Sequence, residues 1–188
     1  IYGEVYKKIN ENSDPLQPIS NYGAMKLSSE SIIYASKHFF RNIYIFRFPN
    51  VVGPNMTHGL LYDLKKKLIK NSSKIKILGD GSQRKPYIHV LNLIKYMDEI
   101  QKKSFDNINV YNLGPKDKGI TVKEIIELFR QIFNLKKTYF VYEKKRHGWI
   151  GDVVEYSYDP KKLINKLNVN IPSSITAIKK SLLELRND

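Results

Sequence analysis

Tyr22 and Lys26 stand four residues apart in the run Pro18-Ile19-Ser20-Asn21-Tyr22-Gly23-Ala24-Met25-Lys26. On a helix this spacing places both side chains on one face, one turn apart. A free phenol is a poor base because its pKa lies at about 10, and a nearby ammonium lowers that pKa by favouring the phenolate. The pair could therefore accept a proton from a substrate hydroxyl while a cofactor removes a hydride.

Spacing alone does not single out this pair, because the same spacing recurs at Tyr62/Lys66 and at Tyr158/Lys162. The sequence context separates the three. Only Tyr22 follows a proline-rich turn and opens a predicted helix with small residues beside the tyrosine. Gly23 inside a helix costs about 1 kcal/mol relative to alanine. We therefore expect some group to come close to the backbone at Gly23.

Strand patterns alternate with helix patterns along the chain, which favours an α/β layer architecture. Helices are predicted from Ser20 or Asn21 to about Phe40, over 60–69, 91–103 and 121–133, and after Pro160 and Pro172; strands are predicted over 43–48, 74–78, 85–90, 109–113 and 139–142. Residues 5–19 carry Asn, Ser, Asp and Pro and are predicted to form an exposed loop.

Two predicted helices have definite inner faces. In the first, Ser20 or Asn21 is the expected N-cap, and Met25, Ile32, Ile33 and Phe39 are available for packing. In the helix that Thr121 caps, apolar residues recur at helical spacing. They are Val122, Ile125, Ile126, Phe129 and Ile132.

Composition narrows the class of protein. The 188 residues carry a net charge of +14 and no cysteine, so disulfide and thiolate chemistry are excluded. The lysines are spread along the whole chain, which favours a solvated surface over nucleic-acid binding. No apolar run is long enough to span a bilayer, and the four histidines lack metal-ligand spacing. We therefore expect a metal-free cytoplasmic protein that binds neither nucleic acid nor membrane.

Four further segments accompany the Tyr22/Lys26 run in a fixed order. They are Arg47-Phe48-Pro49-Asn50-Val51-Val52-Gly53-Pro54, Gly79-Asp80-Gly81-Ser82-Gln83-Arg84-Lys85-Pro86-Tyr87-Ile88-His89-Val90, Tyr111-Asn112-Leu113-Gly114 and Arg146-His147-Gly148-Trp149-Ile150-Gly151-Asp152. With Tyr2-Gly3-Glu4, this set resembles the extended short-chain dehydrogenase/reductases of the NAD-dependent epimerase/dehydratase family. The likeness is greatest to enzymes similar to UDP-glucose 4-epimerase.

The resemblance implies the C-terminal part of a Rossmann-like doubly wound sheet plus a small mixed α/β substrate-binding domain. Residues 1–58 would belong to the NAD-binding domain, and 59–188 mainly to the nucleotide-sugar domain, interleaved with the last Rossmann strands. The family's Gly-rich NAD loop and its catalytic Ser/Thr are missing from these residues. We therefore expect a part of a longer enzyme that is inactive alone, with a homodimer left open for the full-length enzyme.

The resemblance also implies roles for individual residues. Tyr22 corresponds to the catalytic acid/base, and Lys26 to the lysine that holds the nicotinamide ribose and tunes the tyrosine. Pro49 lies where the backbone passes the nicotinamide. Substrate contacts are implied for Asn50, His58, Gly59, Arg84, Lys85 and Arg146.

Two positions depart from the family pattern. Lys85 occupies a slot that usually holds an arginine against the diphosphate, so the bidentate fork is lost there, although the adjacent Arg84 could compensate. Trp149 fills the usual slot of a second phosphate-binding arginine, and Arg146 lies further from Gly151-Asp152 than the family places one.

The function implied is that of an NAD-dependent nucleotide-sugar epimerase that oxidises the sugar at C4 through a 4-keto intermediate. A nucleotide-sugar 4,6-dehydratase and a non-catalytic nucleotide-sugar-binding relative remain alternatives. Neither the nucleotide nor the sugar can be read from these residues.

Overall fold

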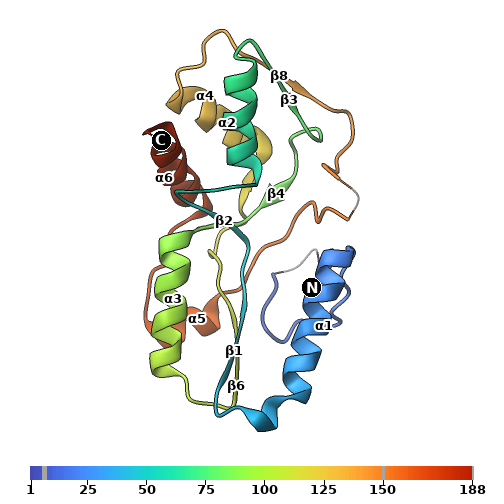
Figure 1. Cartoon of the computed structure of the whole chain (residues 1–188), viewed down its shortest axis with the longest axis vertical. Helices are drawn as coiled ribbons and strands as arrows, with labels where there is room; N and C mark the ends of the chain where they lie inside the picture. Colours follow the sequence, from blue (N-terminus) through green and yellow to red (C-terminus); the bar gives the residue numbers. More distant parts are fainter. Residues whose placement is uncertain (6–7, 150, 188) are drawn as a thin grey trace.

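A parallel pair of strands forms the centre of one half of the molecule (Figure 1). Strand β1 (Ile43–Arg47) pairs with β6 (Ile108–Asn112), with Ile43 opposite Ile108 and Arg47 opposite Asn112. Helices α3 (Val90–Lys103) and α5 (Lys161–Leu167) pack on one side, and α1 (Asn21–Ala35) lies on the other. The structure is a computed structural model that describes residues 1–5, 8–149 and 151–187.

The other half is built on a second parallel pair, β3 (Lys74–Ile77) with β8 (Tyr139–Tyr142). Around this pair lie α2 (Leu60–Lys70), α4 (Val122–Ile132) and α6 (Ser174–Asn187) (Figure 1). Two short pairs connect the halves. Strand β2 (Asn50–Val52) lies parallel to β5 (Tyr87–His89), and β4 (Arg84–Lys85) lies antiparallel to β7 (Ile120–Thr121).

Each half has its own apolar core. Ile100, Leu113 and Leu163 belong to the core of the β1/β6 half, whereas Leu64, Ile75 and Phe129 belong to the core of the β3/β8 half. The chain crosses between the halves several times, because α3, β6 and α5 return to the β1 half after the chain has visited the other. The α/β class with parallel strands, predicted from the alternation of patterns, is confirmed.

Helix α4 forms as the sequence predicts. The Thr121 side chain accepts a hydrogen bond from the Glu124 backbone N–H, and the Glu124 carboxylate accepts one from Thr121, which completes a capping box. Ile125, Ile126 and Phe129 are buried. Local capping and an apolar stripe agree here, so the sequence alone suffices.

The predicted inner face of α1 is wrong. The helix begins as expected, with Ser20 Oγ accepting from the Gly23 N–H at 3.1 Å, but it ends at Ala35 and is followed by a 3₁₀ turn at Lys37–Phe39. Met25, Ile32, Ile33 and Phe39 are exposed. The apolar pattern does not mark the buried side of α1, because the residues of this helix that are buried in the described chain are Gly23 and Glu30.

The prediction of an exposed loop over 5–19 is also wrong in part. Ile9 is buried, bridges to Tyr158 and packs with Tyr2 in a small third cluster. Tyr6 and Lys7 of this loop, Ile150 of the 146–152 segment and Asp188 lie outside the described residues.

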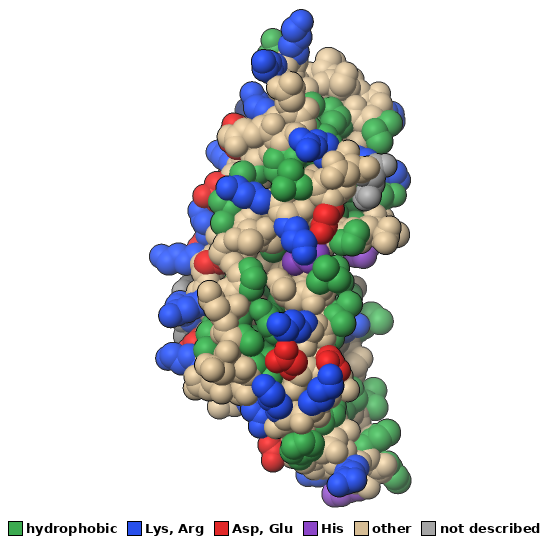
Figure 2. All heavy atoms as spheres, turned by 90° about the vertical axis from the view of Figure 1, so that its left-hand side faces the viewer, with side chains coloured by type: hydrophobic (Ala, Val, Ile, Leu, Met, Phe, Trp, Pro, Cys, Tyr) green, Lys and Arg blue, Asp and Glu red, His purple; other side chains and the backbone are tan. Residues whose placement is uncertain are grey.

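Charged side chains are dispersed on the face that lies to the left in Figure 1. Figure 2 shows lysines and arginines there among acidic, apolar and uncharged groups. No helix in the described part of the chain has the length and apolar character that crossing a membrane requires.

Candidate active site

Tyr22 lies where two cavities meet. One has a volume of about 790 Å³ and lies towards the loop that precedes α2. The other has a volume of about 550 Å³ and lies between α1, β1 and the first residues of the chain. Among the described residues, five line both, namely Tyr22, Phe48, Lys85, Trp149 and Asp152. A ligand that filled both cavities would therefore pass the Tyr22 side chain.

Lys26 follows Tyr22 by one turn of α1 and lines the smaller cavity. Its Nζ lies 5.4 Å from the centre of the Tyr22 ring, so an ammonium stands beside the phenol as the spacing predicts. Gly23 approaches the protein's own chain. A Cβ added there would lie 2.9 Å from Pro18 Cβ, so the turn before α1 explains this glycine.

The other two pairs with this spacing differ in their surroundings. Lys66 Nζ also lies over the ring of Tyr62, at 4.9 Å from its centre. Tyr62 lines the larger cavity but is not among the described residues that line the smaller one. Tyr158 is buried in the small third cluster, and Lys162 turns to the ring of Tyr111. Position at both cavities, and not contact with a lysine, distinguishes Tyr22.

The larger cavity gathers most of the expected substrate residues. Pro49 and Asn50 reach it from the end of β1 and the start of β2, and His58 and Gly59 from the loop before α2. Lys85 reaches it from β4. Lys85 is distant in sequence from the other four, and the pairing of β2 with β5, which sets Asn50 opposite Tyr87, brings its segment beside theirs.

Lys85 forms an ion pair with Asp152 between the two cavities. The Asp152 side chain is buried, and its second oxygen accepts from the Gly148 N–H at 3.2 Å. The ammonium expected to meet a diphosphate therefore already has an anionic partner. Two neighbouring phenols, Tyr87 and Tyr156, have pKa values raised mainly by burial and further by the charge of Asp152.

Arg84 and Arg146 are not among the described residues that line these two cavities. The Arg84 guanidinium donates to the Gly119 carbonyl at 2.9 Å and lies 3.3 Å from the Glu124 carboxylate. Arg146 is exposed and lies 3.8 Å from Glu155. The structure thus gathers the expected site around Tyr22, Lys26 and Lys85 without these two arginines.

A family model decides what kind of protein this is. Residues 1–114 match the model of the NAD dependent epimerase/dehydratase family. The chain belongs to this family.

Relatives within the epimerase/dehydratase family agree with the match. An uncharacterized UDP-glucose epimerase of Bacillus subtilis is 27% identical over 73% of this chain, and a putative UDP-glucose 4-epimerase of Methanocaldococcus jannaschii is 29% identical over 79%. A crystal structure of a UDP-galactose 4-epimerase superposes with a TM-score of 0.85 at 26% identity, covering 99% of this chain and 60% of its own. The chain spans 43% and 48% of the length of the two curated relatives.

Members of the epimerase/dehydratase family depend on NAD, and the residues here suit one end of that cofactor. The smaller cavity offers the Tyr22 phenol and the Lys26 ammonium, which can donate hydrogen bonds to ribose hydroxyls, beside the apolar wall of Phe48. The 188 residues contain no G-x-G-x-x-G run that would hold a pyrophosphate. The fit is therefore to the nicotinamide and its ribose.

Two acidic residues of this site were not predicted. Asp152 forms an ion pair with Lys85, and Glu30 of α1 forms an ion pair with Arg47 at the end of β1. Glu30 follows Lys26 by four residues, as Lys26 follows Tyr22, so the repeated spacing was a usable signal. No local pattern marks Asp152, because its partner is 67 residues away.

Proposed function

We propose that this chain supplies the acid/base pair and the nucleotide-sugar cavity of an NAD-dependent nucleotide-sugar 4-epimerase similar to UDP-glucose 4-epimerase. The observation that carries the proposal is the position of Tyr22 at the junction of two cavities, with Lys26 beside it. One cavity suits the nicotinamide end of the cofactor, and the other is lined by the residues expected to hold the substrate. Membership of the family supports the reaction class.

The division of the chain follows from this arrangement. Residues 1–58 supply the cofactor side through Tyr22, Lys26 and Pro49. Residues 59–188 supply most of the substrate side and return twice to the β1 half through α3–β6 and α5. Two separate apolar cores support this division.

NAD, when bound, supplies the acceptor for the hydride that leaves sugar C4. Tyr22 accepts the proton of the C4 hydroxyl as the C4–H bond breaks, which leaves a 4-keto sugar. Lys26 stabilises the phenolate and holds the ribose beside it. The 4-keto sugar would have to turn its other face of C4 towards the cofactor before a hydride could return there, and Tyr22 would then give its proton back to the C4 oxygen, which yields the epimer. Both atoms removed are restored, so the cycle is redox-neutral overall.

The substrate end is held by groups of the larger cavity. Lys85 contributes a positive charge for the diphosphate, and Asn50 and the His58-Gly59 segment contribute polar contacts from the facing loops. Arg84 and Arg146 complete the proposed set only if substrate draws them away from their present partners, Glu124 and Glu155. Of the three proposed cations Lys85, Arg84 and Arg146, Lys85 is the one found among the described residues that line the larger cavity.

The test is a Tyr22→Phe variant of the natural gene product that carries these residues, assayed with UDP-glucose, UDP-galactose and dTDP-glucose. Removal of the phenolic hydroxyl abolishes proton transfer, so we expect kcat to fall by about 100-fold or more. Tyr34→Phe, on the same helix, is the matched control and keeps wild-type activity. Retention of most of the activity by Tyr22→Phe would remove Tyr22 from this role. Conversion of dTDP-glucose alone to a dehydrated product would favour the dehydratase.

A further inference from the structure

Helix α1 buries little of its side-chain surface against the rest of the described chain. Among its residues only Gly23 and Glu30 are buried, and glycine has no side chain. Its large apolar side chains, including Met25 and Ile32, are exposed. The one buried side chain of the helix that carries Tyr22 and Lys26 is therefore a carboxylate.

Glu30 is bound by a two-point contact to Arg47. Arg47 Nε donates to Glu30 Oε1 at 3.0 Å, and Arg47 Nη2 donates to Glu30 Oε2 at 2.6 Å. Both side chains are nearly excluded from solvent, with 9% of Arg47 and 12% of Glu30 exposed. A bidentate contact of this kind fixes the angle between the two groups as well as the distance.

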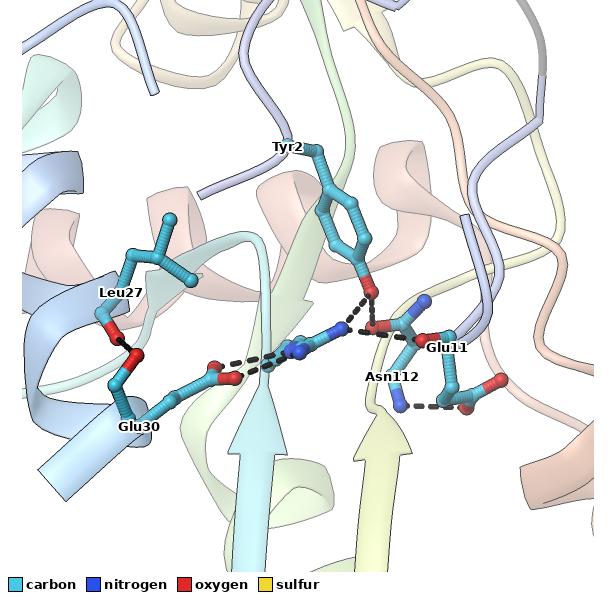
Figure 3. A network of polar contacts seen from close by, with 7 residues as sticks. Tyr2, Glu11, Leu27, Glu30 and Asn112 are labelled. Carbon is cyan, nitrogen blue, oxygen red and sulfur yellow. Dashed lines mark hydrogen bonds and ion pairs between the residues drawn. The ribbon is translucent and has the colours of Figure 1, made fainter. Parts of the chain in front are cut away.

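Arg47 is itself fixed by a second set of hydrogen bonds (Figure 3). Its Nη1 donates to the Tyr2 hydroxyl at 2.8 Å, and that hydroxyl donates to Asn112 Oδ1 at 2.8 Å. The Asn112 N–H donates to the Glu11 carboxylate at 2.7 Å. Burial alone would lower the pKa of Arg47, but its hydrogen bonds to Glu30 and Tyr2 raise it above the ordinary value.

The hydrogen-bond network around Arg47 lies between α1 and the ends of β1 and β6, where it can affect the position of Tyr22 and Lys26. Arg47 and Asn112 are the last residues of β1 and β6 and face each other in the sheet. Glu30 lies one turn after Lys26 on the same side of α1. The contact therefore connects the carboxyl ends of the parallel strands to the face of α1 that carries Tyr22 and Lys26.

We propose that Glu30 and Arg47, held by Tyr2 and Asn112, are positioning residues that set the orientation of the Tyr22/Lys26 face of α1 over the carboxyl ends of β1 and β6. The proposal rests on the proposed function of Tyr22. Stability alone is a weak reason for such a pair, because replacing a buried ion pair by apolar residues of similar volume is often neutral or stabilising. Orientation is what the apolar replacement cannot reproduce.

The experiment compares two kinds of variant in the natural gene product. The double variant Glu30→Met/Arg47→Leu removes both charges and keeps apolar packing, so no buried charge is left alone. Arg47→Lys keeps the charge and loses the fork, and it serves if the double variant does not fold. Asp98→Asn, which removes an exposed ion pair with Lys102 on α3, is the control.

Four quantities are measured for each variant: the urea midpoint, kcat, KM for the nucleotide sugar, and the hydrogen-exchange rate of the α1 amides. In the double variant we expect an unchanged or higher urea midpoint, with α1 exchange faster by about tenfold or more. Misplacement of the acid/base pair should lower kcat by about 10- to 100-fold, while KM stays within about twofold because Lys85 and the larger cavity are untouched.

If Glu30 and Arg47 only stabilised the fold, the expected result would differ. A double variant as stable as the wild type would then also have the wild-type kcat and the wild-type hydrogen-exchange rates in α1. Wild-type values of both in the stability-matched double variant, or in Arg47→Lys, would overturn the proposal. Failure of the proposed function has its own signature. The wild-type gene product would then not turn over nucleotide sugars, and α1 exchange in the two variants would decide the positioning role alone.

Discussion

At the residue scale, the candidate site depends on where cations stand relative to their anionic partners. Lys26 lies beside the Tyr22 ring, whereas Lys85 is paired with the buried Asp152. A lysine ammonium binds a diphosphate as a point charge, whereas arginine offers a fork that can meet two oxygens. The lysine at position 85 should therefore contribute less to diphosphate binding than an arginine would.

Lys85→Arg should strengthen binding of UDP to the natural gene product. One added charge-assisted hydrogen bond contributes about 1 kcal/mol, so we expect an affinity about fivefold higher. Isothermal titration calorimetry measures the change, and Lys85→Met is the opposing variant, expected to weaken binding. Equal affinities for all three proteins would show that the diphosphate is bound elsewhere.

At the scale of elements, short strands connect the two cores and deliver residues to the cavities. Strand β4 carries Lys85 and pairs with β7, whose first residue follows Gly119. Gly119 has a φ of +83°, and a Cβ added there would lie 2.3 Å from the carbonyl carbon and oxygen of Lys85. The pairing of β4 with β7 therefore requires glycine at this position.

Gly119→Ala should destabilise the protein far more than Gly59→Ala. Both glycines have positive φ, but a Cβ on Gly59 meets nothing within 4 Å. Backbone strain alone costs about 1–2 kcal/mol in each, and the clash at Gly119 adds to it. Urea denaturation measures both free energies of unfolding. Equal losses in the two variants would contradict the predicted contact between Gly119 and β4.

At the scale of the whole molecule, three tyrosines have phenol groups that lie away from solvent: Tyr87, Tyr156 and Tyr158. Tyr156 and Tyr158 follow Asp152 by four and six residues, and Tyr87 lies on β5. Burial raises the pKa of all three above the ordinary tyrosine value, and the charge of Asp152 raises it further for Tyr87 and Tyr156. Each phenol therefore stays protonated in the folded protein at a pH where the unfolded chain ionises.

The free energy of unfolding should fall as the pH rises above about 10, the tyrosine pKa of an unfolded chain. The sign follows from the raised pKa values. Below that pH both states are protonated and stability is complete, and above it only the unfolded chain loses protons. Urea midpoints across the alkaline range measure the fall, with phenolate absorbance as the second signal, and Tyr156→Phe should reduce it. A constant midpoint while the absorbance of these phenols rises would refute the prediction.

The sequence by itself determined the local structure and the candidate chemistry. The Ser20 and Thr121 caps, the α4 stripe and the Tyr22/Lys26 spacing depend on neighbours within a few residues, and such short-range interactions are visible in a sequence. The α/β class followed from the same local patterns.

Only the tertiary structure decided which of three Tyr/Lys pairs lies at both cavities, and which charges are buried. The partners in Glu30–Arg47 and Lys85–Asp152 are 17 and 67 residues apart, so no local pattern can pair them. The exposed side of α1 has the same origin, because burial depends on what the whole fold brings against a helix, and an apolar pattern shows only that a face could be buried.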